Sequence, residues 1–129
     1  MADADLITQT GFWWAVKGLL AGGGSQWSSI LHIQRDAVTA TQLLIGGLSN
    51  WACAIRNRAT ADGWTPWEWL NPPLQLGTEY RTVERYLGKP VYAKAVSLGT
   101  GPDASSQKTV YHNITNIQNI VDFGGGMVG

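Results

Sequence analysis

The chain has 129 residues, which is room for one small domain or two very small ones. Nine basic residues balance nine acidic ones, and 14% of the residues are charged, against the ~25% usual in soluble domains. This balance argues against a nucleic-acid binder, which needs a basic surface. The 44% hydrophobic content argues against a disordered tail. The unusual features are 16 glycines and seven tryptophans.

Few residues are available for disulfide, metal or cofactor chemistry. Cys53 is the single cysteine, so the chain forms neither an internal disulfide nor a zinc site with two cysteine ligands. His32 and His112 lie outside any metal-binding spacing, and we expect no metal and no cofactor. The sequence has no apolar run of about 18 residues and no basic amino-terminal segment. We therefore expect neither membrane insertion nor a signal peptide.

In chain order, the first half is predicted to be a series of short strands. The stretch 10–20 fits a strand as well as a helix and runs into glycines, and strands are expected over 29–35, 38–45 and 50–58. Turns are expected at Arg35-Asp36 and at Gly46-Gly47. Alternation in the last strand groups Trp51, Cys53 and Ile55 on one face and Ala52, Ala54, Arg56 and Arg58 on the other.

A proline-rich break divides the chain at about residue 71. Before it, Asp62-Gly63 predicts a turn, and the next strand carries Trp67 and Trp69 on one face, with Pro66 restricting it to a sheet edge or a strand start. After Asn71-Pro72-Pro73, strands are expected over 78–85, 91–98, 108–114 and 117–123, with a turn at 87–90 and a loop at 99–107. Short strands at this spacing indicate an all-β protein, a sandwich or a barrel.

Paired carboxylates raise an enzymatic alternative, a polysaccharide depolymerase fragment. Glu79 and Glu84 are the best pair, and Glu68 and Asp122 are the other acidic candidates. Five positions apart on one strand, Glu79 and Glu84 would face opposite ways. Arg81 and Arg85 stand beside them, which favours structural salt bridges. We therefore expect a non-enzymatic protein with no catalytic residues.

The aromatic segments are the stronger functional signal. Flat rings stack on the C–H faces of sugars while guanidinium groups bind hydroxyls, yet the same residue types also fill cores and subunit interfaces. We expect the core to take Trp13, Trp14, Trp27 and Trp51. The candidate ligand-binding residues are Trp64, Trp67, Trp69, Tyr80, Arg81, Arg85 and Tyr86. The loop 99–107 is a second candidate.

Two parts of the chain resemble one family of proteins. Residues 5–14 (DLITQTGFWW) and the run from Ile55 to Leu70, with its Trp64-Thr65-Pro66-Trp67 sequence, resemble the pyocin-knob module. Residues 77–94, which include Gly88-Lys89-Pro90-Val91-Tyr92, are similar to a region of bacteriophage tail fibres that precedes a receptor-binding β-sandwich. The two similarities lie on both sides of the break at about residue 71.

The resemblance implies a small antiparallel β knob over 1–70 and a short β-sandwich region over 71–129. It implies a homotrimeric tail-fibre protein of a phage or prophage, made in the host cytoplasm and placed in the virion tail. Its partners would be other tail proteins and a bacterial surface polysaccharide or other receptor. Related sandwiches have further strands, so either the chain is a fragment or neighbouring chains complete its sheet. A purely structural fibre connector is the alternative.

Overall fold

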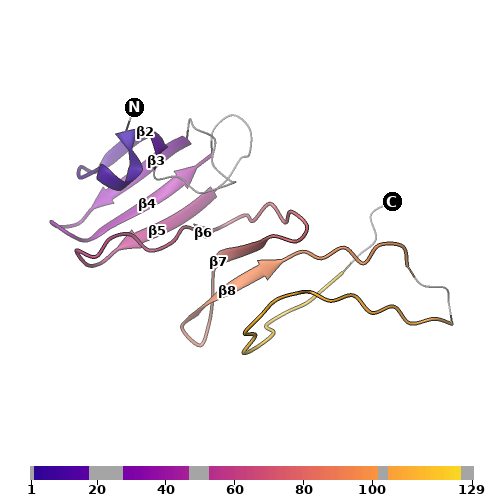
Figure 1. The fold of residues 1–129 in the computed structure, drawn as a ribbon. Helices are drawn as coiled ribbons and strands as arrows, with labels where there is room; N and C mark the ends of the chain where they lie inside the picture. The colour runs from indigo at the N-terminus through magenta and orange to yellow at the C-terminus, as the bar shows by residue number, and fades with distance from the viewer. Residues whose placement is uncertain (1, 18–27, 47–52, 102–104, 126–129) are drawn as a thin grey trace.

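The computed structural model describes residues 2–17, 28–46, 53–101 and 105–125, and this part of the chain is built almost entirely from β-structure. Eight strands follow one another across the sheet in chain order, β1 to β8 (Figure 1). The all-β prediction is confirmed. No helix in the described ranges is long and apolar enough to cross a membrane.

The strands fall into an antiparallel meander and a hairpin. Their bounds are β1 Ala2–Asp3, β2 Gly11–Lys17, β3 Ser28–Gln34, β4 Ala40–Ile45, β5 Cys53–Arg58, β6 Glu68–Trp69, β7 Glu79–Tyr86 and β8 Lys89–Lys94. One 3-10 turn, η1 (Ala4–Leu6), follows β1. Strands β2 to β5 pair antiparallel in register, β1 is parallel to β2, and β6 is parallel to β7.

The strands predicted in the first half form over the described residues, while residues 18–20 and 50–52 of the predicted ranges lie outside them. The stretch that also fitted a helix is a strand, β2, and β4 begins at Ala40 because a turn occupies the preceding residues. In that turn the Asp36 carboxylate accepts hydrogen bonds from the backbone N–H groups of Val38 and Thr39 at 3.0 and 2.8 Å. These bonds lower the pKa of Asp36. The turn predicted at Arg35-Asp36 is therefore confirmed.

The core lies on one face of the meander. Paired residues place Trp13, Ile30, Leu44, Ala54 and Trp69 in a row across β2 to β6. The turn η1 and Ile7 cover this face, and Ala4 and Ile7 belong to the same buried cluster. Trp13 packs against it as expected, whereas Trp14 is 69% exposed, because the next residue of a strand points to the opposite face. Trp27 and Trp51 lie outside the described residues.

The hairpin β7–β8 joins the meander through β6. Trp69 of β6 pairs with Thr82 of β7, across the boundary predicted at residue 71. Leu87 and Gly88 form the two-residue loop between β7 and β8, with φ angles of 49° and 77°. Two positive φ angles in a two-residue loop are typical of the hairpin turn that follows the natural strand twist. The turn expected here is confirmed.

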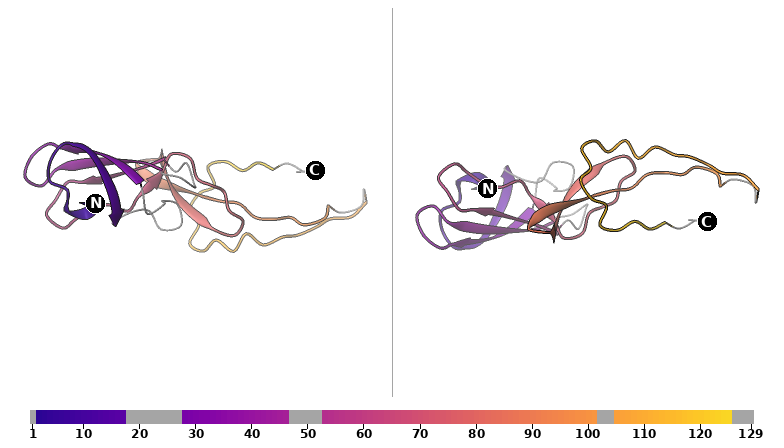
Figure 2. Two further views of the ribbon diagram at one scale, coloured as in Figure 1. Left: turned by 90° about the horizontal axis from the view of Figure 1, so that it is seen from above. Right: turned by 90° about the horizontal axis from the view of Figure 1, so that it is seen from below.

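The carboxy-terminal part of the described chain departs from the prediction. Strands were expected to reach residue 98 and to cover 108–114 and 117–123, but β8 ends at Lys94 and the described residues beyond it contain only one isolated bridge, from Leu76 to Ala95. Residues 95–101 and 105–125 instead run as a long excursion away from the sheet (Figure 2). A strand-like sequence forms a strand only where another strand is available to pair with it. The sandwich and the trimer therefore stay predictions.

Candidate functional site

Three of the seven predicted ligand-binding residues are in the interior. Trp67, Trp69 and Tyr80 are 9, 5 and 7% exposed. The Trp69 and Tyr80 rings meet edge to face, with centroids 5.6 Å apart and planes at 87°, where β6 meets β7. A ring that stacks on a sugar needs an open face, so the structure assigns these three aromatic residues to packing instead.

Trp64 and Trp67 enclose an arginine rather than an external ligand. The Arg56 guanidinium carbon lies 4.6 Å from the Trp64 ring centroid and 4.4 Å from that of Trp67. Trp64 is half-buried, and its outer neighbour is Arg58, 5.0 Å from the ring centroid. Stacking of a guanidinium on an indole is favourable, and more so when water is excluded. These contacts use the ring faces that a sugar would have needed.

Arg56 also connects separate parts of the meander through polar contacts. Its Nε donates to Gln42 Oε1 on β4 at 2.9 Å, and its terminal nitrogen forms an ion pair with Asp5 of η1 at 2.8 Å. Burial lowers the pKa of the Arg56 guanidinium, while the hydrogen bond and charge of Asp5 oppose that shift. An arginine remains a cation under these conditions. The sequence pattern placed Arg56 and Ile55 on different faces of the strand. It did not show that the face with Arg56 is the buried one.

The hydrogen bonds of Arg56 determine which nitrogen of His32 carries a proton. Arginine is only a donor, so the Gln42 oxygen faces Arg56 and the Gln42 amide nitrogen faces His32 Nδ1, 3.1 Å away. That nitrogen therefore accepts, and His32 Nε2 carries the proton and donates to Gln34 Oε1 at 2.7 Å. The network thus fixes the orientation of the fully buried His32 ring and the roles of its two nitrogens.

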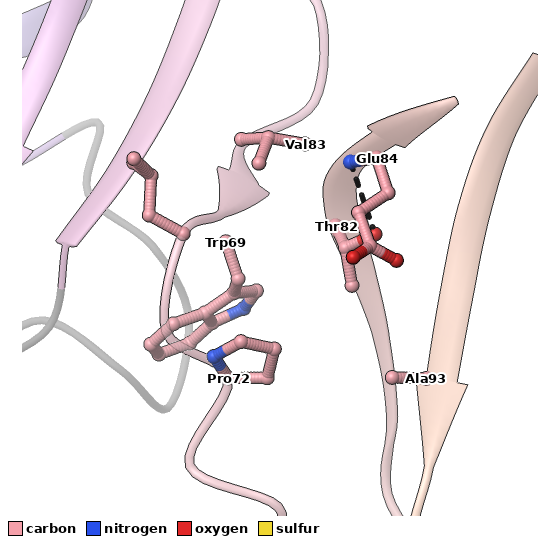
Figure 3. Close-up of a pocket in the computed structure, with 7 residues that line it drawn as sticks. Trp69, Pro72, Thr82, Val83, Glu84 and Ala93 are labelled. Carbon is pink, nitrogen blue, oxygen red and sulfur yellow. Dashed lines mark hydrogen bonds between the residues drawn. The ribbon is translucent and has the colours of Figure 1, made fainter. Parts of the chain in front are cut away.

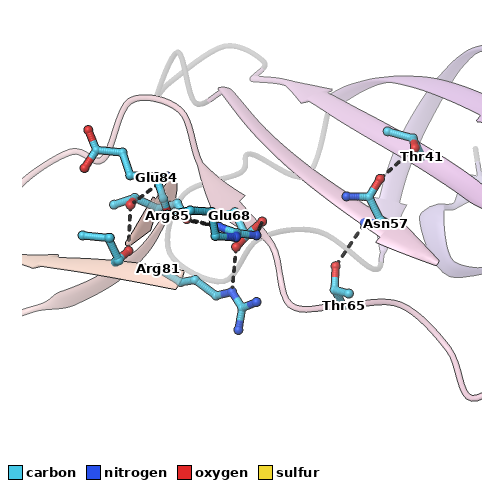
Figure 4. Close-up of polar contacts among 9 residues, drawn as sticks. Thr41, Asn57, Thr65, Glu68, Arg81, Glu84 and Arg85 are labelled. Atoms are coloured by element: carbon cyan, nitrogen blue, oxygen red, sulfur yellow. Dashed lines mark hydrogen bonds and ion pairs between the residues drawn. The ribbon is translucent and has the colours of Figure 1, made fainter. Parts of the chain in front are cut away.

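The two predicted arginines meet at a buried carboxylate. Arg81 Nε lies 3.0 Å from one Glu68 oxygen and an Arg85 terminal nitrogen lies 2.7 Å from the other (Figure 4). Burial alone would raise the pKa of Glu68, but hydrogen bonds from Arg85 and Arg81 outweigh it, so this pKa lies below its ordinary 4.5. The same contact raises the pKa of Arg85. The cluster fastens β7 to β6.

This cluster replaces the ion pairs expected within one strand. Arg81 was expected to pair with Glu79 and Arg85 with Glu84, but both arginines bind Glu68 from the preceding strand. Glu79 and Glu84 remain exposed. Neighbours two positions apart on a strand share a face at the surface, where water screens their charges. The buried Glu68 carboxylate has lost most of its water, and it is compensated by two cations.

A small exposed surface remains around the cluster. Tyr92 of β8 pairs with Arg81 of β7 and is half exposed, and Arg85 keeps 42% of its side chain exposed. We call Arg81, Arg85 and Tyr92 the arginine–tyrosine surface. Tyr86 is exposed at the end of the same hairpin. Sequence reasoning missed Tyr92, although it stands in the quoted segment Gly88-Lys89-Pro90-Val91-Tyr92.

A shallow cavity of about 230 Å³ lies beside Trp69 (Figure 3). Its lining comes from both sides of the β6–β7 joint and consists of Trp69, Leu70, Pro72, Thr82, Val83, Glu84 and Ala93. The lining is about equally polar and apolar and includes one carboxylate, and the volume is below the roughly 300–1,000 Å³ of sites that enclose a small-molecule ligand. The cavity can accept one ring or one apolar side chain.

The described residues contain no group of three His, Cys, Asp or Glu side chains that could hold a metal ion. Comparison with known proteins adds no identification, because no family model, curated protein or solved structure matches the chain. The loop 99–107, the second recognition candidate, is exposed where it is described, at 99–101 and 105–107.

Proposed function

We propose that the chain is a phage or prophage tail-fibre protein that assembles as a homotrimer and contributes to host-cell attachment. Two features support this proposal. The first is the resemblance of residues 5–14 and of Trp64-Thr65-Pro66-Trp67 to the pyocin-knob module, and of residues 77–94 to tail-fibre regions. The second is the all-β knob-and-hairpin architecture.

The observation that carries the proposal is the exposed carboxy-terminal excursion. Its described residues include large apolar side chains in water, among them Ile120, Val121 and Phe123, the last 90% exposed. Apolar surface of this extent is unfavourable in a lone chain and is typical of a surface that another chain covers. A fibre in which neighbouring copies cover one another's excursions accounts for it.

Attachment to a bacterial surface glycan would use the arginine–tyrosine surface. Glu68 holds the two guanidinium groups in place, and Tyr92 pairs with Arg81 across the hairpin. Guanidinium donors beside an aromatic ring suit a sugar that carries hydroxyl or acidic groups. One such shallow site binds weakly, and three copies on a fibre raise the overall affinity through effective concentration.

The second candidate function is a structural fibre connector that binds no receptor. The burial of Trp67, Trp69 and Tyr80 favours it, because most of the predicted binding aromatics serve the fold. The two candidates differ in whether the exposed tyrosine and arginine side chains have an external ligand.

A whole-cell binding assay separates the two. The full chain is labelled and bound to candidate host bacteria, and Tyr92→Ala is compared with Leu6→Ala, an exposed residue of η1 away from the hairpin and the excursion. Attachment through the arginine–tyrosine surface predicts about tenfold weaker binding for Tyr92→Ala, a loss of about 1.4 kcal/mol, with Leu6→Ala unchanged. A wild type that does not bind cells would favour the connector, and equal binding by wild type and Tyr92→Ala would show that attachment uses another surface.

A further inference from the structure

The meander has a second face, whose described side chains are exposed or half-buried. On β2 to β5 the buried residues alternate with residues that point the other way, and this outer face carries a row formed by Phe12, Leu31, Leu43 and Ile55, one from each strand. Phe12 is 81% exposed. Trp14 and Ile45 lie in the adjacent row, and both are exposed. The outer face is thus a continuous apolar surface across four strands.

No described side chain of this face is charged. Its polar members, Ser29, Thr41 and Asn57, are neutral, while Arg56 and Arg58 of β5 point to the other side. A contiguous exposed apolar patch rimmed by polar residues often marks an interaction site. A partner without charge on its contact surface would fit it, because a buried, unpaired charge is costly.

The outer face ends at a polar border. The row through Ile55 continues to Glu68 of β6, whose carboxylate is neutralised by Arg81 and Arg85. An apolar centre with a polar rim is the usual anatomy of a protein interface. The arginine–tyrosine surface therefore lies at the edge of the outer face, where it would stay in contact with solvent after the face is covered.

We propose that the outer face of β2–β5 packs against the same face of two further copies of this chain, around a three-fold axis. The proposal rests on the homotrimer of the proposed function and names the surface that closes it. A face without charge meets its own copies without repulsion or unpaired ions. Since each copy presents the same four-stranded surface, all three apolar faces are covered at once.

The width of the sheet suits this arrangement. Four strands spaced about 4.8 Å apart give a face about 19 Å wide, and three such faces arranged as a triangle each lie about 5.5 Å from the axis. Packed sheets stand ~10 Å apart, so each backbone then lies at about half that spacing from the centre. Side chains of the size of Leu31 and Leu43, which stand in the middle of the row, would fill the interior without a channel.

Analytical ultracentrifugation of the full chain tests the surface. Leu43→Lys and Phe12→Lys place a charge on the outer face, and Leu6→Lys is the control, an exposed leucine of η1 away from it. We expect the wild type and Leu6→Lys to sediment as three chains and both face variants as one. Circular dichroism checks that the variants keep their β-structure, which is expected because Phe12 is already in water within one chain.

The single thiol gives a second measurement. Cys53 stands on the outer face opposite Ile45 and is half-buried. Packing across the face predicts that a maleimide modifies Cys53 at least about tenfold more slowly in the wild type than in Leu43→Lys, since shielding by the neighbouring copies is lost. Equal rates together with an unchanged mass would overturn the proposed surface.

The outcomes distinguish this proposal from the proposed function. If the face variants remain trimers and only Phe123→Lys dissociates them, the excursion alone closes the fibre, and the outer face is not the interface. A wild type that sediments as one chain overturns both the trimer and the surface. Trimers that dissociate as expected but do not bind cells leave the surface in place and remove the attachment function.

Discussion

Arg56 of β5 connects β5 with η1, β4 and the segment between β5 and β6. It reaches Asp5 of η1 and Gln42 of β4, and it lies between the rings of Trp64 and Trp67. The local sequence pattern indicates on which face of β5 Arg56 lies. It does not indicate the four partners, because these come from other parts of the chain. Removal of Arg56 leaves the Asp5 and Gln42 groups without their donor.

We expect Arg56→Ala to lower the free energy of unfolding by roughly 3 kcal/mol, since a buried, paired cation and two ring contacts are lost. Urea unfolding followed by tryptophan fluorescence measures the change. Arg58→Ala is the matched control, because Arg58 contacts Trp64 and the Val38 carbonyl nearer the surface, and about 1 kcal/mol is expected. Equal losses in the two variants would contradict the central role of Arg56.

The lowered pKa of Glu68 implies that the free energy of unfolding depends on pH in the acidic range. Its pKa in the folded chain is below the ordinary 4.5, so the ionised form is favoured by folding. The contribution of Glu68 to stability is therefore complete above pH 4.5 and is lost as the pH falls through the lower, folded-state value.

Glu68→Gln should be less stable than wild type at pH 7, by about 1–3 kcal/mol, because two arginines lose their anion. Its stability should fall less steeply below pH 4.5 than that of the wild type. Thermal unfolding between pH 7 and pH 3 gives both curves, and the exposed Glu79→Gln is the control. Parallel curves for Glu68→Gln and wild type would show that the carboxylate is not the group responsible.

The tautomer of His32 is directly observable. The network predicts that Nε2 donates its proton and that Nδ1 accepts. Nitrogen chemical shifts of the imidazole distinguish the two positions, and Gln42→Leu, which removes the donor to Nδ1, should change the spectrum. A proton on Nδ1 in the wild type would mean that the Gln42 amide is oriented the other way.

Among the elements, the loop of the hairpin β7–β8 contains a strained backbone conformation that a substitution could relieve. Leu87 adopts a φ of 49° in its loop, a conformation that costs a residue with a side chain roughly 1 kcal/mol, while its neighbour Gly88 adopts 77° without that cost. Asparagine tolerates this conformation, and Asn-Gly is the preferred pair in such loops. The exposed Leu87 side chain loses little packing when it is replaced.

Leu87→Asn should therefore raise the free energy of unfolding by up to about 1 kcal/mol, which is an increase in stability from a surface substitution. Leu76→Asn, at an exposed leucine without a positive φ, is the control and should not stabilise the chain. Thermal denaturation compares the two. A lower midpoint for Leu87→Asn would indicate that the leucine makes a contact in an assembly.

Across the whole molecule, sequence patterns predict the structural features that depend on residues close together in the sequence. Alternation located β3 to β5, and turn residues located the hairpin. The same alternation grouped Trp67 and Trp69 but could not show that both would be buried. The sequence did not indicate Glu68 as the partner of Arg81. Strand β6 pairs with β7 through a single parallel residue pair, and such a contact leaves no pattern in the local sequence. The strands expected after residue 105 fail because the described chain offers them no partner.

The described outer face carries no charge. This also determines how an assembly whose chains pack through that face would respond to temperature and salt. Ordinary salt weakens contacts between charges, but this face has none to screen, so the trimer should tolerate sodium chloride and be strengthened by sulfate. Hydrophobic association weakens on cooling, because its driving force near room temperature is entropic. Such a fibre would be closed more tightly at the growth temperature of a warm host than in the cold.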